Sequence, residues 1–120
     1  MQSEAHLYFA PVAPRELTPL ERAVVTRILS AAPQFAGEVP RLRVVGRCAC
    51  GACPTVFFRK LTESGSERDV AHFMGREKGG GLTGAVLLAS EGGLSQLEFY
   101  SVDGHDPWDI PEISTLEPTA

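Results

Sequence analysis

Two stretches of this sequence alternate between apolar and polar side chains, and each contains a short glycine-bearing turn. A period of two is typical of a β-strand with one buried face, and glycine tolerates the positive φ that tight hairpin loops require. The first stretch covers residues 41–61 around Gly51–Ala52, and the second covers residues 85–102 around Gly92–Gly93. The sequence therefore predicts two β-hairpins, which together supply about four antiparallel strands.

A helix is signalled ahead of the two hairpins. Thr18 is a typical N-cap residue, Pro19 takes the first helical position, and Glu21 completes a capping box. Apolar residues then recur at helical spacing until Pro33, so a helix is predicted over residues 19–32. The expected fold class is α+β, an antiparallel sheet of about four strands with one N-terminal helix packed on one face.

The chain of 120 residues has the length of a single domain. We expect an N-terminal arm over 1–17, a core over 18–102 and an extended, acidic, proline-rich tail over 103–120. Within the core, the polar, glycine-rich stretch 62–84 is predicted to be loop, with at most a short helix near 67–75. Because prolines interrupt the tail, it is expected to lack regular structure. Its expected apolar anchors are Trp108, Ile110 and Ile113.

Charge is distributed unevenly along the chain. The formal net charge is −4, yet residues 41–60 carry five cations and no acid, and residues 91–120 carry seven acids and no cation. Either the two segments lie side by side and neutralise each other, or they form surfaces of one sign that steer a partner. The acidic total disfavours non-specific binding to nucleic acid.

The expected location is a reducing cytoplasm. The sequence shows neither a signal peptide nor an apolar run long enough to span a membrane. The number of cysteines, three, is odd, which favours free thiols over disulfides.

The three cysteines form the densest cluster of reactive side chains. Cys48, Cys50 and Cys53 flank the first hairpin turn, and a two-residue loop would set Cys50 opposite Cys53 with all three sulfurs on one side. One hypothesis is a zinc or other soft-metal site, whose fourth ligand would be His72 or His105. A thioredoxin-like redox role is a second hypothesis, although that chemistry requires a helix after the first cysteine. The favoured hypothesis treats the thiols as small apolar residues of the core.

No recognisable set of catalytic groups accompanies these cysteines. The sequence lacks a nucleophile in an activating context and lacks paired carboxylates placed for acid–base work. The leading hypothesis is therefore a non-enzymatic, cytoplasmic protein-binding domain without a cofactor, and the alternative is a small zinc-binding protein built on the cysteine turn. The candidate partner-binding residues are Arg41, Arg43, Arg47, Phe58, Lys60, Tyr100 and Trp108.

Three segments also carry a resemblance to a known family. They are LTPLER at 17–22, CACGACPTV at 48–56 and LSQLEFY at 94–100. With its proline-rich acidic end, the chain resembles a family of short, uncharacterised bacterial proteins found in actinobacteria and proteobacteria. The resemblance implies no catalytic or ligand residues. By analogy with other small α+β domains, it is compatible with a partner-binding role such as that of an immunity protein.

Overall fold

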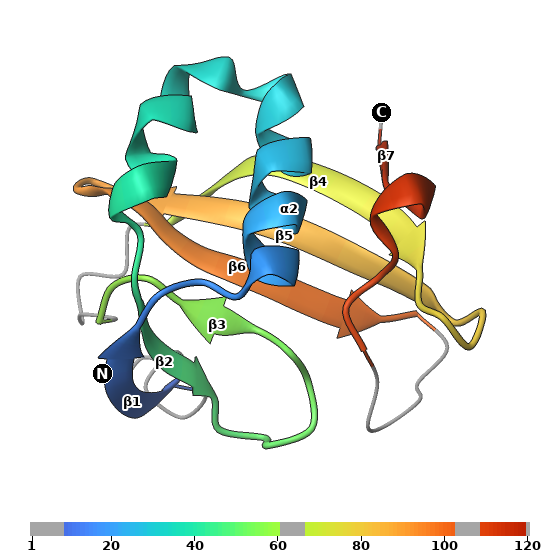
Figure 1. Ribbon diagram of the computed structural model, residues 1–120, viewed down its shortest axis with the longest axis horizontal. Helices are drawn as coiled ribbons and strands as arrows, with labels where there is room; N and C mark the ends of the chain where they lie inside the picture. Colours follow the sequence, from blue (N-terminus) through green and yellow to red (C-terminus); the bar gives the residue numbers. More distant parts are fainter. Residues whose placement is uncertain (1–8, 61–66, 103–108, 120) are drawn as a thin grey trace.

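The computed structural model describes residues 9–60, 67–102 and 109–119, which form one seven-stranded sheet with two longer helices, α2 and η2, on one face (Figure 1). The strands follow the order β1-β2-β3-β6-β5-β4-β7 across the sheet, and every neighbouring pair is antiparallel. The prediction of about four strands with one helix is therefore wrong. The strands are β1 (Phe9–Arg15), β2 (Val44–Cys48), β3 (Val56–Phe57), β4 (Arg68–Arg76), β5 (Leu82–Ser90), β6 (Gly93–Ser101) and β7 (Glu117–Pro118).

A strand replaces the loop that was expected between the two hairpins. β4 pairs with β5 from Arg68↔Ala89 to Arg76↔Leu82, so residues 67–75 contain no helix. The apolar–polar alternation of β4 is hard to recognise in the sequence. Phe73 is a large apolar residue that points to the core, but the inward position two residues later is Gly75, which has no side chain. A side chain there would collide with Leu116. Packing against distant residues thus makes this segment a strand.

Both edges of the sheet come from segments expected to be arm or tail. β1 belongs to the predicted arm and pairs with β2 from Phe9↔Cys48 onward. β7 belongs to the predicted tail and pairs with β4 through Phe73↔Pro118, so the tail does contain regular structure. Proline is compatible with this position because an edge strand leaves one side unpaired. The tail residues Ile110 and Ile113 pack against the core as expected, and Trp108 lies outside the described residues.

The predicted capping box is confirmed at the start of α2 (Pro19–Ile28). The Glu21 amide donates to Thr18 Oγ1 at 3.0 Å, and the Thr18 amide donates to Glu21 Oε1 at 2.9 Å. A one-turn 3-10 helix, η1 (Leu29–Ala31), follows. A second helix, the 3-10 helix η2 (Pro33–Arg41), begins at Pro33, where the predicted helix was expected to end. η2 forms because Phe35 and Val39 pack against the core.

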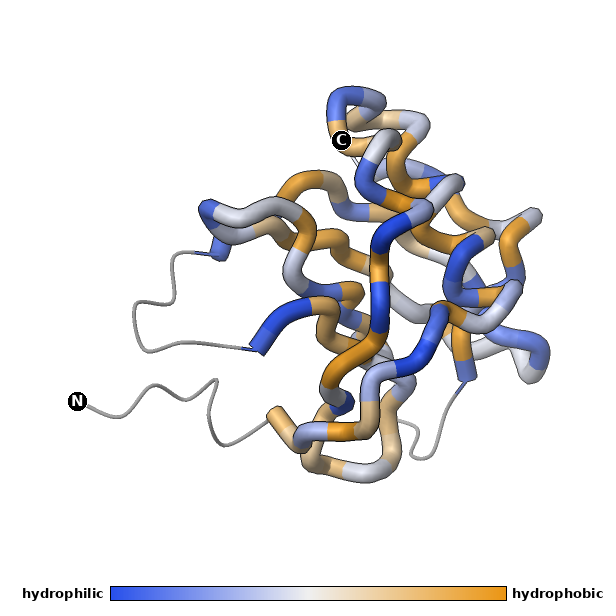
Figure 2. Tube along the Cα trace, turned by 60° about the vertical axis from the view of Figure 1, so that its left-hand side comes forward, coloured by the Kyte–Doolittle hydropathy of each residue, from blue (hydrophilic) through white to orange (hydrophobic). Residues whose placement is uncertain are grey.

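The core lies between the helices and the sheet. Val24, Val25 and Ile28 of α2 are fully buried and face the sheet, whose own buried side chains include Leu87 and Leu97. Along the trace in Figure 2, short hydrophobic and hydrophilic stretches alternate, as expected for elements with one buried face. Another one-turn helix, η3 (Ile113–Thr115), brings the C-terminal segment over the end of the same core.

Candidate metal centre

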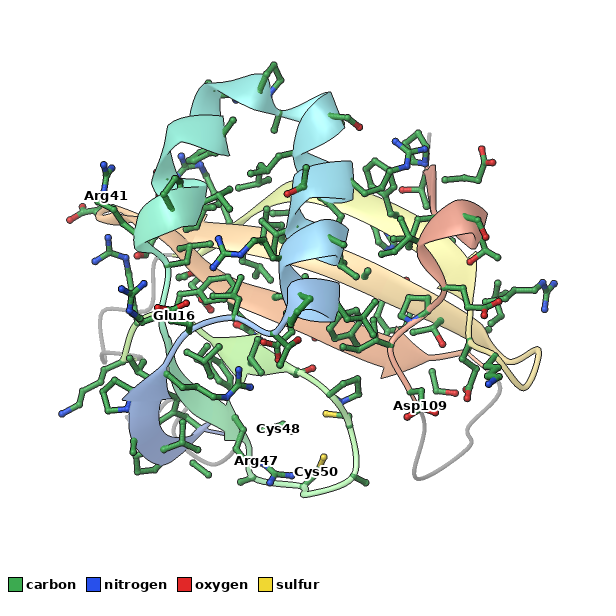
Figure 3. The ribbon with its side chains drawn as sticks, in the orientation of Figure 1. Glu16, Arg41, Arg47, Cys48, Cys50 and Asp109 are labelled. Atoms are coloured by element: carbon green, nitrogen blue, oxygen red, sulfur yellow. The ribbon has the colours of Figure 1, made fainter. Side chains whose placement is uncertain are left out.

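Cys48 is the last residue of β2, and Cys50 and Cys53 lie on the connection from β2 to β3 (Figure 3). The ladder pairs Arg47 with Val56 and ends where the Cys48 amide donates to the Thr55 carbonyl at 3.2 Å. This register is the one expected for a hairpin centred on Gly51–Ala52, but the strands separate before Cys50 and Cys53 can pair. The expected two-residue loop is therefore wrong, and the connection instead bends at Gly51, whose φ is +75°.

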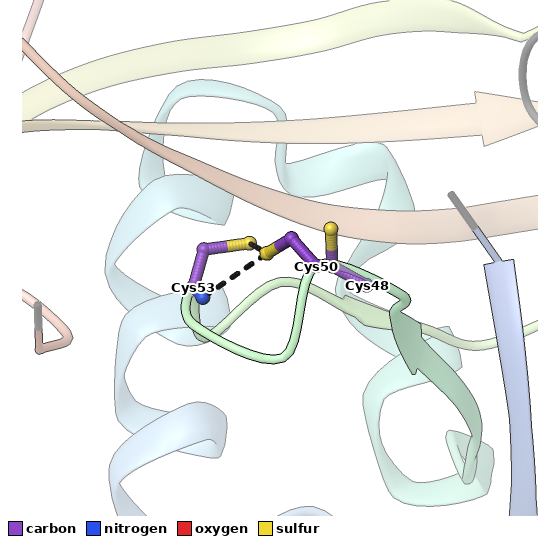
Figure 4. A group of neighbouring side chains, drawn as sticks. All are labelled: Cys48, Cys50 and Cys53. Carbon is purple, nitrogen blue, oxygen red and sulfur yellow. Dashed lines mark hydrogen bonds between the residues drawn. The ribbon is translucent and has the colours of Figure 1, made fainter. Parts of the chain in front are cut away.

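The three sulfur atoms nevertheless gather at one point, as the turn predicted. All three Sγ atoms lie within 4.8 Å of one another, and those of Cys50 and Cys53 are 3.4 Å apart (Figure 4). The thiols are free, with Cys50 exposed and Cys48 and Cys53 half-buried. The favoured hypothesis of buried core thiols is therefore wrong for Cys50, whereas the half-buried Cys53 does pack against the core.

Backbone amides are directed at the central sulfur. Cys50 Sγ accepts hydrogen bonds from the amides of Ala52, at 3.4 Å, and Cys53, at 3.3 Å. Desolvation raises the pKa of Cys50, but these amides and the neighbouring thiols outweigh it and lower the pKa to about 7. Desolvation raises the pKa of Cys48 to about 12, with the other two thiols adding to the shift. The turn therefore favours one thiolate first, at the position most open to solvent.

Among the described residues, the cysteines are the only group of three or more metal-type ligands close enough to hold an ion. His72, a predicted fourth ligand, lies on β4, where its Nε2 is 2.7 Å from the Tyr100 hydroxyl. His105 lies outside the described residues. No helix begins at Cys50 or Cys53, which form part of a turn leading into β3. The arrangement required for thioredoxin-like chemistry is therefore not present.

A hollow of about 340 Å³ adjoins the cysteine turn. Cys53 and Thr55 form part of its wall, and Arg15, Glu21 and Arg47 also line it. Arg15 and Glu21 form an ion pair at 2.9 Å. Burial alone would raise the pKa of Glu21, but the bonds from Arg15 and from the helix cap outweigh it and lower the pKa. The hollow therefore has a fixed polar wall beside the thiols.

Thr55 is a structural residue of this turn that the sequence pattern does not single out. Its buried Oγ1 accepts a hydrogen bond from the Phe99 amide at 2.9 Å and donates one to the Phe99 carbonyl at 3.2 Å. These bonds fasten the end of the cysteine turn to β6. The only local signal is the Pro54-Thr55 pair, because proline has no N–H and a neighbouring hydroxyl can take its place.

The predicted partner-binding residues that the structure describes differ in their exposure and contacts. Phe58 is only 7% exposed and packs in the core, so it offers little surface to a protein partner. Tyr100 is exposed, but the described residues that contact its hydroxyl are His72 and Met74 of β4. Trp108 lies outside the described residues. The protein-binding role stays a prediction. The remaining candidates, all exposed, are Arg41, Arg43, Arg47 and Lys60.

The cationic segment is not neutralised within the described part of the chain. The ion pair between Arg15 and Glu21 is the only one among the described residues, so none of the five cations of 41–60 pairs with an acid there. In Figure 3, Arg41 lies at the end of η2, whereas Asp109, of the acidic tail, lies on the opposite side of the view. Among these residues, the cations remain available to an external anion.

No protein-family model matches this sequence, and comparison with curated proteins and with solved structures finds no match. The resemblance carried by the cysteine hairpin therefore stays a prediction. In the parts of the chain that the structure describes, no helix combines the length and the apolar character needed to cross a membrane.

Proposed function

We propose that this protein binds a soft metal ion, zinc in the first instance, through Cys48, Cys50 and Cys53. The observation that carries the proposal is the convergence of three Sγ atoms within 4.8 Å. A tetrahedral zinc ion with Zn–S bonds of about 2.3 Å holds its sulfurs about 3.8 Å apart, which lies within the range of these separations. Small movements of the three side chains would complete the geometry.

The ionisation of the thiols supports the same function. Zinc binds thiolates, so each cysteine must lose its proton when the metal binds. Cys50 is close to half ionised at neutral pH because its pKa is about 7, whereas Cys48, with a pKa of about 12, is protonated in the metal-free protein. Cys50 is therefore the first contact for an incoming ion, and the affinity for metal rises with pH. The backbone amides of Ala52 and Cys53 stabilise the negative charge that the thiolates bring.

The arrangement supplies three protein ligands from the described residues and leaves a fourth coordination position. Three protein ligands with one open position are typical of zinc sites that exchange a ligand, whereas closed structural sites use four. Copper(I) also prefers thiolates, so the metal selectivity has to be measured.

Elemental analysis of protein purified without chelator, with a phosphine reductant in place of thiols, tests the proposal. We expect one zinc ion per chain, and we expect cobalt(II) added to metal-free protein to give the intense near-ultraviolet absorption of thiolate coordination. Substoichiometric metal together with no cobalt absorption would contradict the proposal.

Single-residue variants locate the site. Each of the three Cys→Ser variants should lose most of the cobalt absorption, and C50S is the most informative because its exposed side chain contributes least to packing. Ala49→Ser is the matched control, since it adds the same side chain to the same turn and keeps all three thiols. Equal losses in the control and in C50S would mean that the turn, and not the thiols, had been disturbed.

A further inference from the structure

A second hollow, also of about 340 Å³, lies at the other end of β2 from the cysteines. Its apolar lining consists of Leu42, Phe58 and Leu94, which are almost fully buried. Its polar lining comes from three separate parts of the chain: the end of η2 with the residues leading into β2, the segment after β3, and the β5–β6 turn. The charged residues of this lining are Glu38, Arg41, Arg43 and Arg59.

The guanidinium groups around this hollow have no acidic partner among the described residues. Arg43 donates to the Leu42 carbonyl at 2.9 Å, Arg59 donates to the Gly92 carbonyl, and Arg41 makes neither a hydrogen bond nor an ion pair there. Each guanidinium has five N–H groups, so most of these donors are unused. The arginines therefore converge on one space with free hydrogen-bonding capacity.

The one carboxylate in the lining already has a structural role. Glu38 Oε1 accepts the Leu94 amide at 2.8 Å, which holds η2 against the β5–β6 turn. Glu38 forms no ion pair with Arg41, Arg43 or Arg59. Three positive charges and one negative charge leave the hollow with two positive charges in excess.

We infer that this hollow binds a small phosphomonoester. The excess of two positive charges matches a phosphate monoester, which carries about −1.5 to −2 charges at neutral pH. Guanidinium groups present paired N–H donors that suit phosphate oxygens, and the apolar floor suits the carbon skeleton of the ester. A volume near the lower end for ligand pockets favours a small molecule over a polymer. The inference concerns a different end of β2 and does not depend on metal binding.

Titration of the full-length protein with phenyl phosphate, followed by ¹H–¹⁵N NMR, tests this inference. We expect saturable shifts of the Leu42, Gly92 and Leu94 amides, which line the hollow. Inorganic phosphate should bind more weakly because it cannot use the apolar floor, and benzoate should bind more weakly because it carries a single negative charge. Shifts that do not saturate, or benzoate binding as tight as that of phenyl phosphate, would overturn the inference.

Charge variants separate the site from general attraction of anions. R41Q and R43Q should each weaken phenyl phosphate binding by about tenfold or more, since each removes a charged hydrogen-bond donor. E38Q should tighten it, because glutamine can still accept the Leu94 amide while one negative charge is lost. Arg76→Gln is the matched control, as Arg76 is an exposed arginine at the far end of β4. Equal effects of R41Q and the control would overturn the inference, and NMR spectra of the free variants report whether each is folded.

Discussion

Replacing Thr55 with valine should destabilise this protein far more than the same replacement at Thr83. The β3–β6 ladder pairs Val56 with Leu97. If the ladder continued by two more residues, Pro54 would lie opposite Phe99. Proline has no N–H to offer, and Thr55 Oγ1 instead bonds both the amide and the carbonyl of Phe99. The Thr55 hydroxyl thus replaces the backbone hydrogen-bond partner that Pro54 cannot supply.

The expected magnitude follows from what valine leaves behind. Valine has nearly the same shape as threonine, but the buried N–H and C=O of Phe99 would both lose their partner on this side. A buried polar group without a partner costs about 1–3 kcal/mol, so with two such groups the T55V variant should lose about 2–6 kcal/mol of unfolding free energy. Thr83 is also fully buried, yet its Oγ1 has no hydrogen-bond partner in the described part of the chain. T83V should therefore be neutral or slightly stabilising.

Urea denaturation of the two variants beside the native protein measures both values. We expect unchanged m-values and a clearly lower midpoint for T55V alone. Because Thr55 holds the end of the cysteine turn on β6, T55V should also bind zinc more weakly than T83V. If the two variants differ by less than about 0.5 kcal/mol, the role assigned to the Thr55 hydroxyl is wrong.

Three further predictions concern the cysteine turn and the helix cap. In metal-free protein, iodoacetamide should modify Cys50 first and Cys48 last, because the pKa of Cys50 is about 7 and that of Cys48 is about 12. The rate at Cys50 should rise with pH through a midpoint near pH 7. Peptide mass spectrometry measures the rates, and equal rates for the two thiols would contradict the assignment. The folded-state pKa of Glu21 is lowered, so its stabilisation is present above the unfolded pKa and is lost as pH falls through the folded pKa. Between pH 7 and pH 3, the unfolding free energy of E21Q should therefore fall less steeply with decreasing pH than that of the native protein. An equal pH dependence in the two proteins would argue against the ion pair. Gly51→Ala should lower the unfolding free energy by about 1 kcal/mol and weaken zinc binding, because φ at this position is +75°. Urea denaturation and cobalt titration measure the two effects. A variant with unchanged stability and binding would mean that the turn tolerates another backbone conformation.

The features predicted correctly from the sequence are those set by neighbouring residues. The capping box needs only Thr18 and Glu21, three positions apart, and both of its hydrogen bonds form. The alternation over 85–102 likewise sets the β5–β6 hairpin. Its turn falls at Glu91–Gly92, one residue before the expected Gly92–Gly93, because Ser90 pairs with Gly93. In each case the interacting groups lie within one turn or one hairpin, so the local pattern contains the information.

The features that were missed depend on contacts between distant residues. β4 becomes a strand because β5 pairs with it on one side and β7 on the other, and β7 reaches it from the C-terminal segment. A polar, glycine-rich sequence gives no local indication of these partners. η2 was missed for a similar reason, since Phe35 and Val39 are apolar but their covering surface comes from elsewhere in the chain.

The two candidate sites differ in the same way, since one depends on neighbouring residues and the other on distant ones. The convergence of Cys48, Cys50 and Cys53 follows from one turn and was predicted, whereas their exposure depends on how soon β2 and β3 separate. Three residues of the arginine hollow, Arg41, Arg43 and Phe58, were predicted to bind a protein partner. The hollow itself was not predicted, because Arg59 and Glu38 meet only through the packing of η2 on the β5–β6 turn. The sequence indicated which residues carry charge, but the fold determines which of them share a ligand.

The two proposed sites lie at opposite ends of β2, and we expect them to bind their ligands independently. Arg43 precedes this strand and Cys48 ends it, five residues apart and therefore roughly 16 Å along an extended chain. Coupling between two sites requires an element with two arrangements that both ligands bias, and β2 is held in register by β1 on one side and β3 on the other. The affinity for phenyl phosphate should therefore be the same in zinc-loaded protein and in C50S. A difference of more than about threefold would mean that zinc binding at the turn shifts β2 and, with it, the arginines at its other end.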